Sequence, residues 1–285
     1  MQEISPHIFI ETEFPGVTLA VLRCQRGLIL IDTPLRIDDT RAWRSMLAGM
    51  TGGYERLLVV MDEHFDRTLG IRQLECMTIG HEALSLALKD RPMSFKTQGQ
   101  ESGAEWELVN GLGVVRWAVP DITYSASLNL YWDQFPIYLR SVPGPSLGST
   151  WVELPQQKIL FVGDTVIPGA PPFLAAADLP AWQETLEKLL SPTYKGYMLV
   201  SGRAGVITSA DVKEQSKFLG KVQQQIEKLT GKDNIPHEVE HICLQLLKNF
   251  DTKSPGTEHY YSRIFYGLTQ YLKRHTAAGV TRNEK

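Results

Sequence analysis

Short apolar segments that end abruptly in acidic residues are the feature that most constrains the fold of this 285-residue sequence. Residues 57–61 form one such segment, which runs directly into Asp62, and residues 158–162 form another, which runs into Gly163-Asp164. A strand that is apolar on both faces is typical of a sheet that helices cover. Because α/β proteins place their sites in the loops at strand ends, the pattern predicts an α/β fold with a site built from such loops.

The rest of the chain predicts strands in its first two thirds and helices in its last third. We expect hairpins at 17–31 and 149–162, one strand at 124–131, and helices that begin near Asp38, Leu69 and Pro180. From Ser209 onward, apolar residues recur at helical spacing. No long linker precedes them, so we predict one domain at 1–207 and a helical C-terminal extension at 208–285 that packs on it.

Composition and charge exclude several classes of partner. The chain carries 29 basic and 32 acidic residues, a formal net charge of -3, which gives no electrostatic footprint for nucleic acid or for an anionic membrane. Its three cysteines are isolated and predict neither a disulfide framework nor a cysteine zinc site. Neither a signal peptide nor an apolar run long enough to span a bilayer is found, so we expect a cytoplasmic protein.

Four polar motifs follow apolar segments and carry the chemistry. In chain order they are Asp62-x-His64-x-Asp66-Arg67, Gly144-Pro145-Ser146, Gly163-Asp164 and Gly202-Arg203-Ala204-Gly205. Their order and spacing resemble those of the metallo-β-lactamase superfamily, whose motifs are HxHxDH, GH, GD and a GHG-like turn. The resemblance covers roughly residues 5–207. It implies a four-layer αββα sandwich and a two-metal hydrolase site at the strand ends.

The metal ligands of that family are mostly replaced here. The first metal site of the family uses the first two motif histidines and the GH histidine, and the matching residues are Asp62, His64 and Pro145. The second site uses the motif aspartate, the last motif histidine and the GHG histidine, and the matching residues are Asp66, Arg67 and Arg203. The bridging aspartate is kept as Asp164. One of the five family histidines therefore remains, together with both aspartates.

These replacements predict a network of arginines and carboxylates in place of the second metal. Arginine keeps its proton near neutral pH and has no lone pair for a metal. Arg67 and Arg203 can instead neutralise Asp66 and Asp164 through fork-shaped hydrogen bonds. We therefore predict a non-catalytic homologue without a metal cofactor, whose pocket binds an anionic small molecule through the arginines.

A metal-dependent hydrolase is the alternative. Asp62, His64 and Asp164 offer two carboxylates and an imidazole, a set suited to one Mn, Fe or Mg ion, and less so to Zn. Such an ion would activate a bound water as a nucleophile. A scaffold that serves only protein interactions is a third option, and the sequence alone leaves open whether the protein is an enzyme. No GxSxG motif supports a serine hydrolase.

The tail adds three weaker signals. His237 and His241 match the HExxH zinc pattern, but no third ligand follows, so we interpret this segment as a solvated helix. Residues 259–266 are rich in aromatic side chains and predict a helix packed on the core, with a place at the pocket mouth as the alternative. The tail would also allow a homodimer, for which the sequence gives no direct sign.

Overall fold

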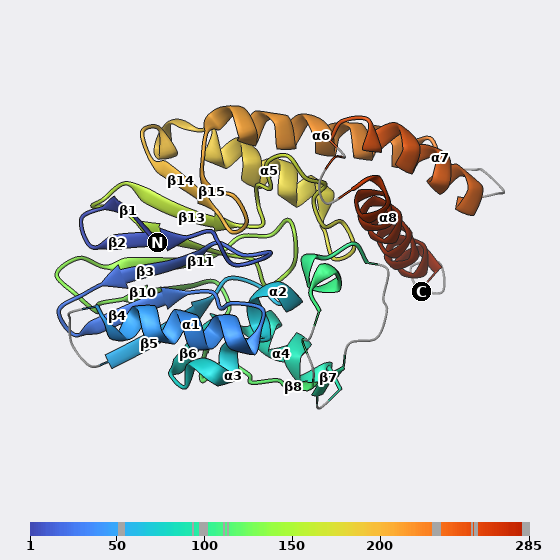
Figure 1. Ribbon diagram of the computed structural model, residues 1–285. Helices are drawn as coiled ribbons and strands as arrows, with labels where there is room; N and C mark the ends of the chain where they lie inside the picture. Colours follow the sequence, from blue (N-terminus) through green and yellow to red (C-terminus); the bar gives the residue numbers. More distant parts are fainter. Residues whose placement is uncertain are drawn as a thin grey trace.

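Two β-sheets stack face to face between two layers of helices (Figure 1). The computed structural model describes residues 1–50, 55–92, 94–96, 102–110, 112, 114–229, 235–251, 253 and 256–280. The arrangement is the αββα sandwich expected from the sequence, so this prediction is confirmed.

The first sheet has seven strands in the order β1-β2-β3-β4-β5-β6-β9. Neighbours are antiparallel from β1 to β4 and parallel from β4 through β5 and β6 to β9. The strands are β1 Gln2–Ser5, β2 Ile8–Glu11, β3 Leu19–Arg23, β4 Gly27–Ile31, β5 Glu55–Val60, β6 Met77–His81 and β9 Ile122–Tyr124.

The second sheet has six strands in the order β10-β11-β12-β13-β14-β15, and only β13 and β14 run parallel. Its strands are β10 Ser127–Leu130, β11 Ile137–Ser141, β12 Thr150–Leu154, β13 Ile159–Gly163, β14 Met198–Ser201 and β15 Gly205–Ile207. A separate pair is formed by β7 Ser94–Lys96 and β8 Val114–Arg116.

Strand alternation explains why the buried parts of both central strands, residues 57–60 of β5 and 159–162 of β13, are apolar throughout. In β5, Leu57 and Val59 face the core between the sheets, whereas Leu58 and Val60 face the helices on the other side. Strand β13 divides its side chains in the same way between the sheet–sheet core and the second helix layer. Since side chains on a strand alternate with a period of two, each central strand needs apolar residues at every buried position.

The helices form the two outer layers. On the first sheet lie α1 Ile37–Ala48, α3 Ile71–Leu74 and α4 Glu82–Asp90, which bury Trp43 and Leu84 against it. On the second sheet lie α5 Leu179–Leu189, α6 Ser209–Glu227, α7 Ile235–Leu247 and α8 Thr257–Val280. Short helical turns occur at α2 Phe65–Thr68, η1 Glu105–Leu108 and η2 Pro192–Tyr194.

The C-terminal helices share one core with the second sheet. Leu219 of α6 and Ile264 of α8 lie in the same buried cluster as Trp182 of α5 and Leu160 of β13. Helix α6 begins at Ser209, directly after β15. The tail thus packs against the sandwich, while a domain boundary at residue 207 stays a prediction.

One expected strand was wrong, and one expected helix is short and is preceded by a separate helical turn. The single strand at 124–131 is two strands, since β9 ends in the first sheet and β10 starts in the second. Apolar and polar residues keep alternating at Ser125, where the chain passes from the first sheet to the second. The periodicity of the sequence therefore could not reveal this passage. The helix expected near Leu69 is the short α3, which α2 precedes, and the chain turns at Gly70 where an added Cβ would lie 2.4 Å from the Pro34 carbonyl.

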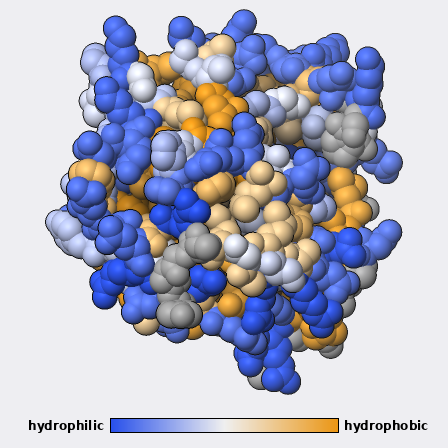
Figure 2. Space-filling model, turned by 60° about the vertical axis from the view of Figure 1, so that its left-hand side comes forward, coloured by the Kyte–Doolittle hydropathy of each residue, from blue (hydrophilic) through white to orange (hydrophobic). Residues whose placement is uncertain are grey.

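Three other observations bear on the expected class of protein. All three cysteines are free, as predicted. Within the described ranges, no helix is long and apolar enough to cross a membrane. The face in Figure 2 is mostly hydrophilic, with apolar side chains scattered among charged ones, as is usual for a folded domain in water.

Candidate functional site

Loops from both sheets meet at one end of the sandwich. Asp32 follows β4, Asp62 follows β5, and these two strands are parallel neighbours, so both carboxylates lie at the same sheet edge. Asp164 follows β13, and Arg203 lies in the turn between β14 and β15. The backbone N–H of Thr150 donates to the Met61 carbonyl at 2.8 Å, which fixes the two sheet edges against each other.

The loop after β5 turns two charged side chains inward. Oδ1 of Asp62 accepts a hydrogen bond from the backbone N–H of His64 at 2.9 Å, which closes a tight turn before α2. Asp66 and Arg67 in the first turn of α2 are fully buried. Oδ1 of Asp66 in turn accepts a bond from the Trp106 backbone N–H at 2.9 Å, which anchors the 102–110 segment over the site.

Arg67 binds three carboxylates in the interior. Its Nη1 donates to Asp32 at 2.8 Å, its Nη2 donates to Asp164, and its Nε lies 3.1 Å from Asp62. Burial opposes the charged form, but the three carboxylates outweigh it and raise the pKa of Arg67 above its ordinary value. Arg67 is therefore a permanent cation at the centre of the site.

Arg203 binds the other side of Asp164. Its Nε and Nη2 donate to both oxygens of Asp164 at 2.9 to 3.1 Å, in the forked geometry typical of arginine and carboxylate. Its Nη1 donates to Asp66 at 2.8 Å, to Glu105 at 2.7 Å and to the Gly16 carbonyl at 3.0 Å. Only 5% of its side chain is exposed, so neither arginine points to solvent.

The carboxylates of the site differ in the direction of their pKa shifts. Burial alone would raise the pKa of Asp66 and Asp164, but their charged contacts, mainly with His64 for Asp66 and with Arg203 for Asp164, hold both pKa values well below the usual range. Burial instead raises the pKa of Asp32 to about 7 despite its bond to Arg67. Burial also raises the pKa of Asp62. Asp66 and Asp164 are thus firmly ionised.

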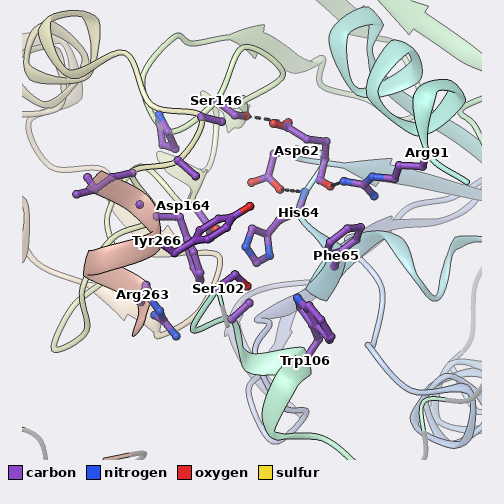
Figure 3. A pocket seen from close by; sticks show the side chains of 18 residues that line it. Asp62, His64, Phe65, Arg91, Ser102, Trp106, Ser146, Asp164, Arg263 and Tyr266 are labelled. Carbon is purple, nitrogen blue, oxygen red and sulfur yellow. Dashed lines mark hydrogen bonds between the residues drawn. The ribbon is translucent and has the colours of Figure 1, made fainter. Parts of the chain in front are cut away.

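A cavity of about 240 Å³ lies beside this network. His64, Pro145 and Asp164 form part of its wall together with Asp62, and Figure 3 shows the ring of His64 and the side chain of Tyr266 pointing into it. Most of the other lining side chains are apolar: Phe65, Ala104, Trp106, Phe173, Leu174, Ala175 and Ala176. The pocket therefore has a polar floor and apolar walls, as small-molecule sites commonly do.

Sequence reasoning missed two charged residues that connect the tail to the site. Glu105 of η1 binds Arg203 at 2.7 Å and Arg263 of α8 at 2.5 Å. Arg263 is fully buried and also donates to the carbonyls of Gly103 and Pro171. The network therefore runs from the sheet edges through Glu105 into α8.

Helix α8 also supplies part of the pocket wall. Arg263, Tyr266 and Gly267 all line the cavity. The aromatic segment 259–266 therefore lies at the pocket, which was the alternative expected from the sequence. The guanidinium groups of Arg203 and Arg263 both lie over the ring of Phe173, with their Cζ atoms 4.5 Å and 4.4 Å from the ring centroid. Such stacking favours a fixed orientation for both arginines. His237 and His241 are exposed on α7, as the solvated-helix interpretation expects.

The donor set decides which metals the site could hold. Two of the three groups at the second metal position are guanidinium groups, which have no lone pair to donate, so this half does not fit a metal. Pro145 has no donor for the first position, and Ser146 beside it donates to Glu63 at 2.8 Å. Across the described part of the chain, no group of three His, Cys, Asp or Glu side chains is arranged to hold a metal ion.

Comparison with solved structures identifies the fold. The sequence matches no protein-family model and no curated protein. A metallo-β-lactamase from Pontibacter korlensis is 17% identical, with a TM-score of 0.61 over 77% of this chain and 97% of that one. A metallo-β-lactamase family protein from Thermus thermophilus is 16% identical, with a TM-score of 0.65 over 96% of each chain.

A stereoselective inverting sec-alkylsulfatase from Pseudomonas sp. is also similar, at 14% identity and a TM-score of 0.66, over 95% of this chain and 49% of that one. Likeness at this level of identity defines the fold and leaves the activity open. The chain has the metallo-β-lactamase fold, as its motifs predicted.

Proposed function

We propose that this protein is a small-molecule-binding member of the metallo-β-lactamase fold that works without the two-metal centre and without hydrolysis. One observation carries the proposal: Arg67 and Arg203 both bind Asp164, the residue that would bridge two metals in the resembling family. The network supplies positive charge from side chains where the family uses ions.

The energetics support a lasting replacement. Buried carboxylates without a counter-charge are costly, and both arginines provide that charge with hydrogen bonds to both oxygens of Asp164. A metal could use these oxygens only after displacing two buried guanidinium groups. Displacement would also leave both buried arginines without carboxylate partners. The network therefore opposes metal binding in two ways: it occupies the oxygens, and it makes their release costly.

The pocket is the part that remains available for function. Its walls come from the loop after β5, from the 102–110 segment and from α8, so elements far apart in the sequence enclose it. Its polar floor is held rigid by the network. A cytoplasmic location and a homodimer stay predictions alongside this proposal.

Hydrolysis assays test the proposal. Ester, lactone and phosphodiester substrates should give no turnover above an Asp164→Asn control, either alone or with added Zn, Mn or Fe. The alternative, a hydrolase with one metal at Asp62, His64 and Asp164, requires metal-dependent turnover that the Asp164→Asn variant loses. Such turnover would overturn the proposal.

A further inference from the structure

One carboxylate oxygen at the pocket floor has no partner. Oδ1 of Asp62 accepts the bond from the His64 backbone, whereas Oδ2 accepts none from the described residues and points into the pocket (Figure 3). Only 6% of the Asp62 side chain is exposed. Because Asp62 lines the cavity, a ligand or a water there can donate to this oxygen, so Asp62 marks a place where a donor fits.

A second carboxylate lines the same cavity. Glu63 accepts one bond, from the Ser146 hydroxyl at 2.8 Å, and forms no salt bridge with any side chain in the described segments. Asp62 and Glu63 are consecutive and both line the pocket. The floor therefore offers acceptors from two carboxylates to one bound group.

The arginines near the pocket are already engaged. Arg67, Arg203 and Arg263 each bind carboxylates. Arg91 has no carboxylate partner among the described residues, but its guanidinium group lies over the Phe65 ring at 4.1 Å and donates to the Glu63 carbonyl at 2.5 Å. Among the arginines, few free donors remain for an anion.

Acidic groups outnumber basic ones around the pocket and its network. The basic side chains are those of Arg67, Arg91, Arg203, Arg263 and His64, and the carboxylates are those of Asp32, Asp62, Glu63, Asp66, Glu105 and Asp164. Negative charge in a confined apolar surrounding raises the local concentration of cations. The balance favours a positively charged ligand.

We propose that the pocket binds a compact organic cation, a protonated amine on an apolar body, whose ammonium group donates to Asp62 and Glu63. This inference rests on the proposed binding function and names its ligand class. An ammonium group has three donors and no acceptor, which matches a floor of unpartnered carboxylate oxygens. The apolar body contacts Trp106, Ala175 and Ala176, and a cavity of about 240 Å³ limits it to a small ring or short chain.

The anion predicted from the sequence provides the competing outcome. Arg67 and Arg203 were expected to hold it, but their donors bind Asp164 and the neighbouring acids. An anion would have to use Arg91, close to the two pocket carboxylates that the cation would use. The two ligand classes therefore depend on different residues, and one set of variants separates them.

Calorimetric titration with three one-ring probes tests the inference. Benzylamine, benzyl alcohol and benzoate share a ring and differ in charge, and at pH 7 we expect measurable binding of benzylamine alone. Asp62→Asn should weaken it by about tenfold or more, because a hydrogen bond to a charged group is lost. Glu63→Gln should weaken it as well, while the exposed Glu184→Gln serves as the matched control and should leave it unchanged.

Three results would overturn the inference: binding of none of the probes, equal binding of benzyl alcohol and benzylamine, or binding of benzoate that Arg91→Gln abolishes. Circular dichroism checks that each variant is folded, and if Asp62→Asn is not, Glu63→Gln carries the test. Metal-dependent turnover in the same preparations would contradict the proposed function, whereas probe selectivity tests the ligand class by itself.

Discussion

Replacing Arg67 with methionine is the perturbation that should reveal most about the network. Methionine keeps an unbranched chain of similar length but removes the charge that Asp32, Asp62 and Asp164 share. Removing one partner of a buried ion pair costs about 3–5 kcal/mol, because it leaves an uncompensated charge inside. Domains have a total stability of roughly 5–15 kcal/mol, so Arg67→Met should lose a large share of it.

The pH dependence of the loss gives a second check. Without Arg67, the folded-state pKa values of Asp32 and Asp62, which burial already raises, should rise further, and the lowered pKa of Asp164 should rise as well. A raised pKa adds stability at low pH that is lost as pH rises through the folded-state value. The deficit of Arg67→Met relative to wild type should therefore be smaller at pH 5 than at pH 8.

Urea unfolding followed by tryptophan fluorescence and circular dichroism measures both effects. The control is Arg41→Met, which removes an exposed pair with Asp38 in which both side chains are more than 70% exposed. Exposed pairs contribute about 0–1 kcal/mol. If Arg67→Met costs no more than Arg41→Met, or if its deficit is independent of pH, the reasoning is refuted.

Two further predictions concern single positions. Burial raises the pKa of Asp32 to about 7, so the folded state holds a proton that the unfolded state releases near pH 4, and wild-type stability should fall between these values as pH rises. Asp32→Asn should flatten this slope, which urea midpoints at pH 5 and 7.5 will measure, and an unchanged slope would contradict the assignment. Gly103→Ala should lose more than about 1 kcal/mol, because Gly103 has φ +66° and a Cβ there would lie 2.4 Å from the Arg263 backbone nitrogen. Gly169→Ala is the matched control, with φ +71° and open space around it, and similar melting temperatures for the two variants would show that α8 does not pack tightly on the 102–110 segment.

The sequence predicts the sheets and the core of the site for a physical reason. The buried parts of β5 and β13 are short runs of apolar residues followed by acids, a pattern that few other elements produce. Asp62, Asp66 and Asp164 could be placed together because the loops after β5 and β13 meet at one end of the sandwich. The passage of the chain from the first sheet to the second at Ser125 could not be predicted, since strands of both sheets show the same alternation of apolar and polar residues.

The role of the tail was harder to predict. Glu105 is one of three glutamates between residues 101 and 107 and lies far in sequence from every motif, so nothing in the sequence marks it as a bridge. Arg263 did leave a signal: it lies three residues after Tyr260 and one before Ile264, on the buried face of α8. A lone arginine on an apolar helix face requires a buried acidic partner, and that partner is Glu105.

Metal content tests the central claim most directly. Protein purified without chelators or an affinity metal would be incubated with Zn, Mn and Fe, desalted and subjected to elemental analysis beside an Asp164→Asn control. If Arg67 and Arg203 stand in for the ions, wild type and control should both carry only background metal. Near-stoichiometric metal in wild type that disappears in Asp164→Asn would contradict the account and identify a metal-dependent site.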